Sequence, residues 1–135
     1  MAEFPDKVRL VFKDFPLGFH AGALPAAEAA RCAGELGRFW EYHDLLFVGQ
    51  PAFSTTDLLG YAARLRLPTE PFAPCLESHR HRDAVLADLA EGRAAGVRGT
   101  PTFFVNGRRL VGAQPLQVFQ KAVQDALADG AGKQP

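Results

Sequence analysis

The chain has 135 residues and an ordinary globular composition: 47% are hydrophobic, 22% are charged, and 15 Lys and Arg balance 15 Asp and Glu. This length predicts a single domain, residues 1–135, with a sizeable core. The zero net charge does not favour nucleic acid or an anionic membrane surface, and no apolar run approaches the length of a membrane span. We therefore expect neither a nucleic-acid partner nor a membrane partner.

The N-terminal residues predict a strand without a leader sequence. Met1–Lys7 lacks the apolar segment of a signal peptide, so the chain as given is expected to be cytoplasmic. In Val8–Phe12 apolar side chains fall on both faces, which is typical of a strand covered on both sides in an α/β sheet. Pro16 then ends the strand, because proline gives up a ladder hydrogen bond.

A long helical region is predicted next. Pro25 suits the first position of a helix, Ser54 and Asp57 form a capping-box pattern, and Thr69 is a suitable helix cap. Apolar residues recur at helical spacing in each segment. The expected helices are Ala26–Leu36, Arg38–Phe47, one after Ser54, a short one after Thr69, and about Asp83–Arg93.

The C-terminal part contains the strongest local pattern. Thr102–Val105 has the composition of a buried strand, Asn106-Gly107 tolerates the positive φ of a type I′ turn, and Arg108–Val111 returns as a second strand. A last helix is predicted from Pro115. Its apolar stripe consists of Leu116, Phe119, Val123, Ala126 and Leu127.

Several segments, in order, resemble the DsbA-like disulfide oxidoreductases of the thioredoxin fold. In chain order they are Phe12–Leu17 with His20, the Ala-rich helix that carries Cys32, Gly37–Phe47, and Gly-Val-Arg-Gly-Thr-Pro-Thr-Phe-Phe-Val-Asn-Gly (96–107). The resemblance covers about Val8–Ala128. It implies an α/β, thioredoxin-like fold with a helical insert, about 24–97, between the first strand and the C-terminal hairpin and helix.

The resemblance also assigns a substrate-binding role to Thr100 and Pro101. In that family the peptide bond before this proline is cis, and the preceding residue offers backbone groups to a bound peptide. The implied partners are therefore extended peptides or protein thiol substrates.

The chain departs from the family at its catalytic element. The family carries Cys-x-x-Cys at a helix N-terminus, where the dipole and free N–H groups stabilise the attacking thiolate. That strand and helix precede the strand expected at Val8–Phe12, and no Cys-x-x-Cys occurs in this chain. We therefore expect a domain that is incomplete at its N-terminus and has no catalytic residue, and a periplasmic or other extracytoplasmic location if an upstream segment was lost.

The cysteines leave one question open, whereas the spacing of the histidines gives a definite expectation. Cys32 and Cys75 are either buried thiols that pack as small apolar groups or, as in some DsbA-like proteins, a structural disulfide. His79 and His81 are two positions apart, which does not put two ligands on one helix face, so no metal site is expected. No cofactor is expected either.

Three hypotheses for function remain. The first is a disulfide oxidoreductase of this family that is inactive as given, because it lacks its catalytic pair. The second is a non-catalytic peptide- or protein-binding module, and the third is a glutathione-conjugate enzyme of the same fold. The family's central strand, absent here, would leave the edge of Thr102–Val105 open. Either Val8–Phe12 pairs directly with that edge, which gives a three-stranded sheet, or a second copy covers it; we favour the homodimer.

Overall fold

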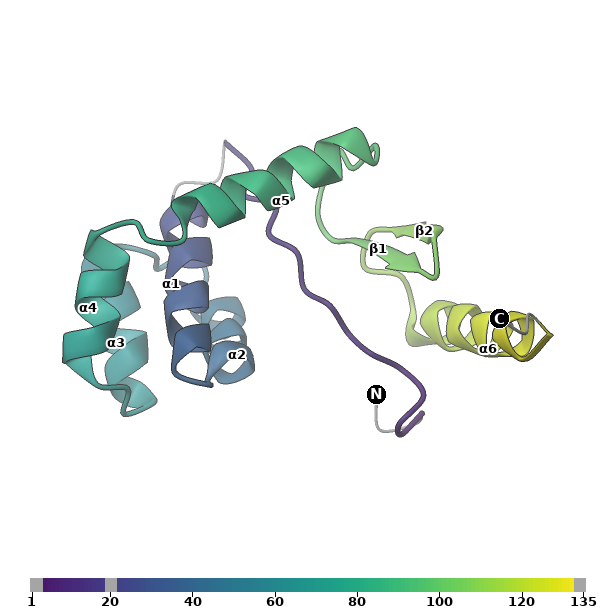
Figure 1. The fold of residues 1–135 in the computed structure, drawn as a ribbon, viewed down its shortest axis with the longest axis horizontal. Coiled ribbons are helices and arrows are strands. Elements are labelled where there is room, and N and C mark those ends of the chain that lie inside the picture. Colours follow the sequence, from purple (N-terminus) through teal and green to yellow (C-terminus); the bar gives the residue numbers. More distant parts are fainter. Residues whose placement is uncertain (1–3, 19–21, 133–135) are drawn as a thin grey trace. The chain divides into compact units, whose positions relative to one another are not determined.

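The computed structural model describes residues 4–18 and 22–132, so His20 lies outside the described residues (Figure 1). The chain divides into two compact units. The helical unit comprises Lys13–Ala94. The hairpin unit comprises the described residues of Met1–Phe12 and Ala95–Pro135. The predicted insert, about 24–97, falls mostly within the helical unit.

Five helices form the helical unit, close to the ranges predicted from the sequence. The capping box is present: the Ser54 side chain accepts a hydrogen bond from the Asp57 backbone N–H, and Asp57 accepts one from the Ser54 backbone. Thr69 is the first residue of its helix rather than its cap, which is Pro68. The helices are α1 (Ala23–Glu35), α2 (Phe39–Gly49), α3 (Thr55–Arg64), α4 (Thr69–Glu77) and α5 (Arg82–Ala94).

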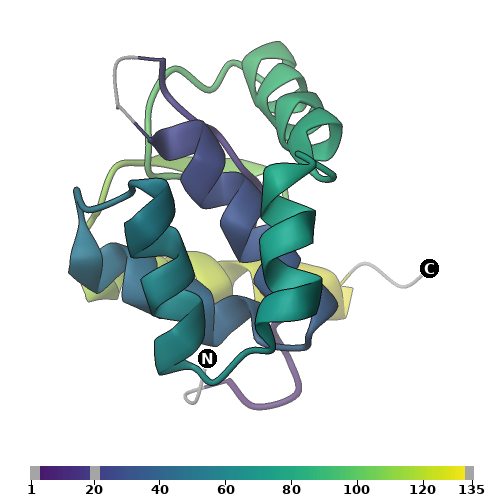
Figure 2. The same ribbon diagram turned by 90° about the vertical axis from the view of Figure 1, so that its left-hand side faces the viewer.

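The core of the helical unit is built on the small residues of α1. Its buried face carries four alanines and Cys32, so neighbouring helices approach it closely. The Tyr42, Leu58 and Phe72 side chains, at most 1% exposed, fill the space between the helices seen in Figure 2. The buried Tyr42 hydroxyl donates to the Leu58 carbonyl at 2.8 Å, so this polar atom is satisfied.

A buried ion network joins the start of the helical unit to two of its helices. Arg31 donates to the Asp14 carboxylate at 2.7 Å and to the Asp88 carboxylate at 2.8 Å. The Asp14 backbone N–H also donates to Asp88, at 2.9 Å. Burial raises the pKa of Asp14, and the hydrogen bond from Arg31 opposes that shift.

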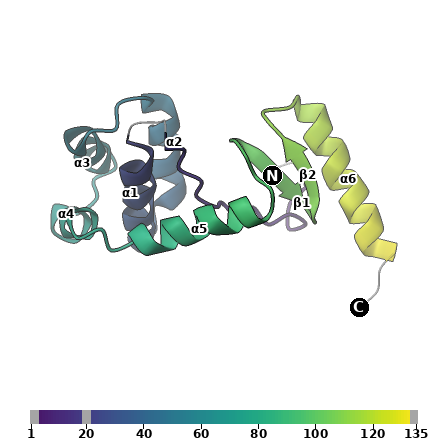
Figure 3. The same cartoon turned by 90° about the horizontal axis from the view of Figure 1, so that it is seen from above.

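The hairpin unit contains β1 (Thr102–Val105), β2 (Arg108–Val111) and α6 (Leu116–Gly132) (Figure 3). The strands are antiparallel, with Phe103 opposite Leu110. Asn106 has φ 48° and Gly107 has φ 88°, the positive values that the predicted type I′ turn requires. The hairpin prediction is therefore correct.

Helix α6 packs on one face of the hairpin through aromatic contact. The Phe103 and Phe119 rings meet edge to face, with centroids 4.8 Å apart. Ala122 is the most deeply buried described residue of α6, whereas Leu116, predicted to lie on the apolar stripe, is 67% exposed. The stripe therefore begins one turn later than the sequence pattern predicted.

The predicted strand at Val8–Phe12 is not a strand in the structure. Leu10 and Val11 are more than half exposed. Within the described residues the sheet has two strands, β1 and β2. An extended apolar segment becomes a strand only where a neighbour supplies ladder hydrogen bonds, which composition alone does not show. The described residues thus combine helices with a small two-stranded antiparallel sheet, which is an α/β composition.

Candidate functional site

The loop before β1 is held by one cis peptide bond and two hydrogen bonds. The Thr100–Pro101 peptide bond is cis. The Pro101 carbonyl accepts a hydrogen bond from the Gly112 backbone N–H at 2.8 Å, and the Thr102 hydroxyl donates to the Gly99 carbonyl at 2.7 Å. Thr100 and Pro101 are exposed, so the two residues that the resemblance assigned to substrate binding are accessible from solvent.

The hairpin has one covered face and one open face. Side chains alternate along a strand, so Phe103 and Leu110 lie on the face that packs against α6. Thr102, Phe104 and Val111 lie on the other face. Phe104 is 47% and Val111 60% exposed, so this face presents apolar surface.

The outer edge of β1 is also open as far as residues 4–18 and 22–132 are concerned. The hydrogen bond from Gly112 to Pro101 fixes the ladder, so residues 101, 103 and 105 face β2. The backbone N–H and C=O groups of Thr102 and Phe104 therefore point away from β2. On the outer edge of β2, by contrast, the Gln114 side-chain amide donates to the Val111 carbonyl at 2.8 Å. Of the two edges, β1 is the more open to another strand.

A hollow of about 430 Å³ adjoins the open face. Gly96 has φ +85°, and a Cβ built there would come within 2.9 Å of an Arg109 guanidinium nitrogen, so glycine lets this side chain lie close. The same guanidinium donates to the Ala95 carbonyl at 3.3 Å. The lining residues, two of them arginines, are Gly96, Val97, Arg98, Gly99, Thr102, Arg109 and Val111.

A second cluster of chemical interest lies in the helical unit. Cys32 on α1 and Cys75 on α4 are joined by a disulfide, with Cα atoms 5.9 Å apart and both residues 1% exposed. Of the two alternatives left open by the sequence, the structure contains the disulfide. The bond ties two helices across 43 positions of sequence.

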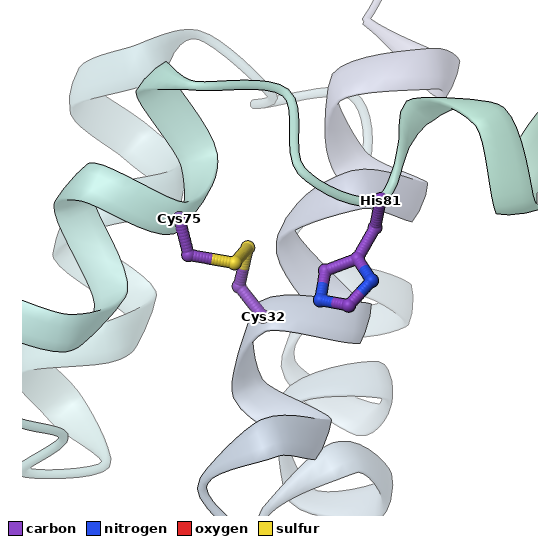
Figure 4. Close-up of side chains that lie close together, drawn as sticks. All are labelled: Cys32, Cys75 and His81. Carbon is purple, nitrogen blue, oxygen red and sulfur yellow. A yellow bond between two sulfur atoms is a disulfide. The ribbon is translucent and has the colours of Figure 1, made fainter.

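His81 lies beside this disulfide (Figure 4). It follows α4 in the turn that leads to α5, and its candidate ligand atom lies within 4.8 Å of both sulfur atoms. Spacing along the sequence paired His81 with His79 and gave no signal for this cluster. The structure instead pairs His79 with the buried Glu28 carboxylate, at 3.0 Å.

The comparisons with known proteins agree with this fold. The sequence matches the thioredoxin family over residues 3–125. The chain belongs to this family. No solved structure matches the chain.

The similar curated proteins are much longer than this chain and carry a transport name. The Na(+)/H(+) antiporter NhaA 1 of Salinispora arenicola is 43% identical over 122 residues, 90% of this chain and 19% of that protein. The Na(+)/H(+) antiporter NhaA of Herminiimonas arsenicoxydans is 41% identical over 133 residues, 98% of this chain and 21% of that protein. The chain thus spans about a fifth of the length of these relatives.

These relatives correct one expectation from the sequence. Zero net charge and the lack of a long apolar run led us to expect no membrane partner, and the antiporter relatives contradict that expectation. In the described residues, none of the helices has both the length and the hydropathy needed to cross a bilayer. The composition of this chain reflects only the fifth of such proteins that it matches, and for this reason it gave the wrong expectation about a membrane partner.

Proposed function

We propose that this chain is a thioredoxin-like module of the disulfide oxidoreductase type that binds extended polypeptide and, as given, does not turn over disulfides. The observation that carries the proposal is the open edge of β1. The outward N–H and C=O groups of Thr102 and Phe104 can pair with an added strand, and such backbone pairing supplies affinity without a fixed sequence.

The surroundings of the edge favour a particular kind of peptide. Phe104 and Val111 offer apolar contact on the open face. Arg98 and Arg109 line the adjoining hollow and favour a carboxylate. The expected ligand is therefore an extended segment that alternates apolar and polar side chains and carries one acidic residue, lying beside Thr100 and Pro101.

The absence of turnover follows from the sequence. The two cysteines are 43 positions apart and form a buried disulfide, so no Cys-x-x-Cys pair is available to attack a substrate and resolve the mixed disulfide. An insulin-reduction assay is expected to show no activity above background. Activity that disappears when Cys32 or Cys75 is changed would overturn this part of the proposal.

Peptide binding is tested by amide chemical shifts of the labelled chain. The probe is a ten-residue peptide, blocked at both ends, of alternating valine and threonine with one central aspartate. Phe104→Pro removes an outward N–H while leaving the groups that face β2, and we expect it to weaken binding by more than tenfold. Phe104→Thr keeps that N–H and should weaken binding less. Equal effects of both variants, or shifts confined to the helical unit, would overturn edge binding.

A second candidate function rests on the relatives. Because 90% of the chain is 43% identical to part of a Na(+)/H(+) antiporter, we infer that a module of this kind works together with such a transporter. The test combines this chain with the part of the Salinispora arenicola relative that it does not match, in detergent micelles. Co-elution in size-exclusion chromatography is expected, and separate elution would refute the inference.

A further inference from the structure

Three side chains that are good ligands for zinc meet in the helical unit, from three separate parts of the sequence. Cys32 comes from α1, Cys75 from α4, and His81 from the turn before α5 (Figure 4). One ligand atom from each lies within 4.8 Å of the other two. Thiolate sulfur and imidazole nitrogen are the combination that structural zinc sites use.

The imidazole contributes a second, independent observation. Nε2 of His81 is buried and makes no hydrogen bond of regular geometry within the described residues, although it forms an ion pair with the Glu35 carboxylate. Buried polar atoms are rarely left unpaired, and those that are call for an explanation such as an ion. The Glu35 carboxylate lies close to this nitrogen, with Oε1 3.3 Å from Nε2, in an ion-pair contact without hydrogen-bond geometry.

We propose that the reduced chain binds one Zn²⁺ ion through Cys32, Cys75 and His81, and that the carboxylate of Glu35, which lies outside this 4.8 Å group in the oxidised chain, moves in as the fourth ligand. Two ligand atoms each about 2.0 Å from a tetrahedral zinc ion lie about 3.3 Å apart. The distance from Nε2 to Oε1 already has this value. Cys32 and Glu35 are three residues apart on α1 and so share a face of that helix.

The surroundings of Glu35 suit a ligand role. Arg80 donates to both of its carboxylate oxygens, at 2.9 and 2.8 Å. A partner of this kind orients a metal-bound carboxylate. Glu35 is exposed, so its carboxylate is accessible to an ion in solvent.

Reduction must precede metal binding. A dithiol reductant delivers two electrons and two protons to the Cys32–Cys75 bond, which breaks to give two thiols, while the reductant closes to its own disulfide. The sulfur atoms then separate to about 3.8 Å, as two thiolates on one zinc ion require. Zn²⁺ displaces both thiol protons, because the thiolate is the ligand. The same pair thus gives a disulfide in an oxidising compartment and a metal site in a reducing one.

The test measures metal binding to both redox states of the whole chain. The chain is treated with a phosphine reductant, which does not compete for zinc as a thiol does, and titrated with Zn²⁺ and separately with Co²⁺. We expect one Zn²⁺ per reduced chain, a thiolate-to-cobalt charge-transfer band with Co²⁺, and neither for the oxidised chain. If the reduced chain is unfolded without metal, Zn²⁺ should restore its helical circular dichroism.

A matched pair of histidine variants sharpens the result. His81→Gln should weaken Zn²⁺ binding to the reduced chain by more than tenfold, whereas His79→Gln, two positions away and paired with Glu28, should leave it within twofold of the unchanged chain. The proposal is overturned by a reduced chain that binds no Zn²⁺, by equal losses in the two variants, or by the absence of the cobalt charge-transfer band. These outcomes are independent of peptide binding at β1.

Discussion

The helical unit and the hairpin unit bury their apolar residues to very different extents. In the helical unit, five helices enclose Tyr42, Leu58 and Phe72 almost completely, and a disulfide joins two of them. In the hairpin unit, Phe104 and Val111 remain about half exposed on a two-stranded sheet. The first unit is therefore closed by contacts distant in sequence, whereas the second is built from local signals and keeps an open face and edge.

Replacing both cysteines is expected to give the largest loss of stability, and to give it in the helical unit. In the chain-entropy model, a bridge that closes a loop of this length contributes about 4 kcal/mol. Cys32→Ala combined with Cys75→Ala should therefore lower the free energy of unfolding of the oxidised chain by about that amount, measured by urea denaturation. Amide shifts of β1 and β2 in the native state should stay unchanged. Loss of the hairpin signals without urea would show that the units are not separable.

A matched pair of leucine truncations compares the two units directly. Leu58 is 1% exposed in the helical unit, and Leu58→Ala should cost about 3 kcal/mol through lost burial and the cavity left behind. Leu116, 67% exposed in the hairpin unit, should change stability by less than about 0.5 kcal/mol when replaced by alanine. Thermal and urea unfolding measure both, and comparable losses would contradict the comparison.

Replacing the glycine in the turn of the hairpin is expected to strain the backbone and destabilise the hairpin. Gly107 has φ +88° with open space around it, so Gly107→Ala strains the backbone and should cost about 1 kcal/mol. Gly99 also has open space and has no positive φ, so Gly99→Ala is the control and should be nearly neutral. The measurement is the population of the hairpin from amide shifts. A neutral Gly107→Ala would show that the turn does not set the register.

Two carboxylates of the helical unit should change the free energy of unfolding with pH in opposite directions, and by less than the substitutions above. Hydrogen bonding to Arg80 lowers the pKa of Glu35 below 4.5, so its stabilisation is present above that pH and is lost as the pH falls through the folded-state pKa. Burial raises the pKa of Asp14 above 3.8, so on acidification the folded chain protonates Asp14 at a higher pH than the unfolded chain does. The free energy of unfolding therefore rises as the pH falls through the folded-state pKa.

The experiment is urea denaturation of Glu35→Gln and Asp14→Asn between pH 7 and pH 3. Relative to the variant, the unchanged chain should lose stability on acidification in the first case and gain it in the second. For Glu35 we expect less than about 1 kcal/mol, as for an exposed ion pair. Shifts of the same sign would contradict the environments seen in the structure.

Elements whose signals are local could be predicted from the sequence. Ser54 and Asp57 placed the start of α3, and Asn106-Gly107 placed the turn between β1 and β2, because capping and turn geometry depend on residues at most three positions apart. The thioredoxin-like class followed from the order of such segments. Cys32 and Cys75 were paired only through the resemblance to a family, since spacing left their state open.

Features that depend on residues distant in sequence could be found only in the folded structure. Val8–Phe12 has the composition of a strand, yet it has no strand hydrogen bonds, because pairing needs a partner that composition cannot supply. His81 has no helical neighbour that would complete a metal site. His81 and Cys32 are 49 positions apart in sequence, and they lie side by side only because α1 and α4 pack together. Side-chain clusters of this kind depend on how helices pack, which local periodicity does not encode.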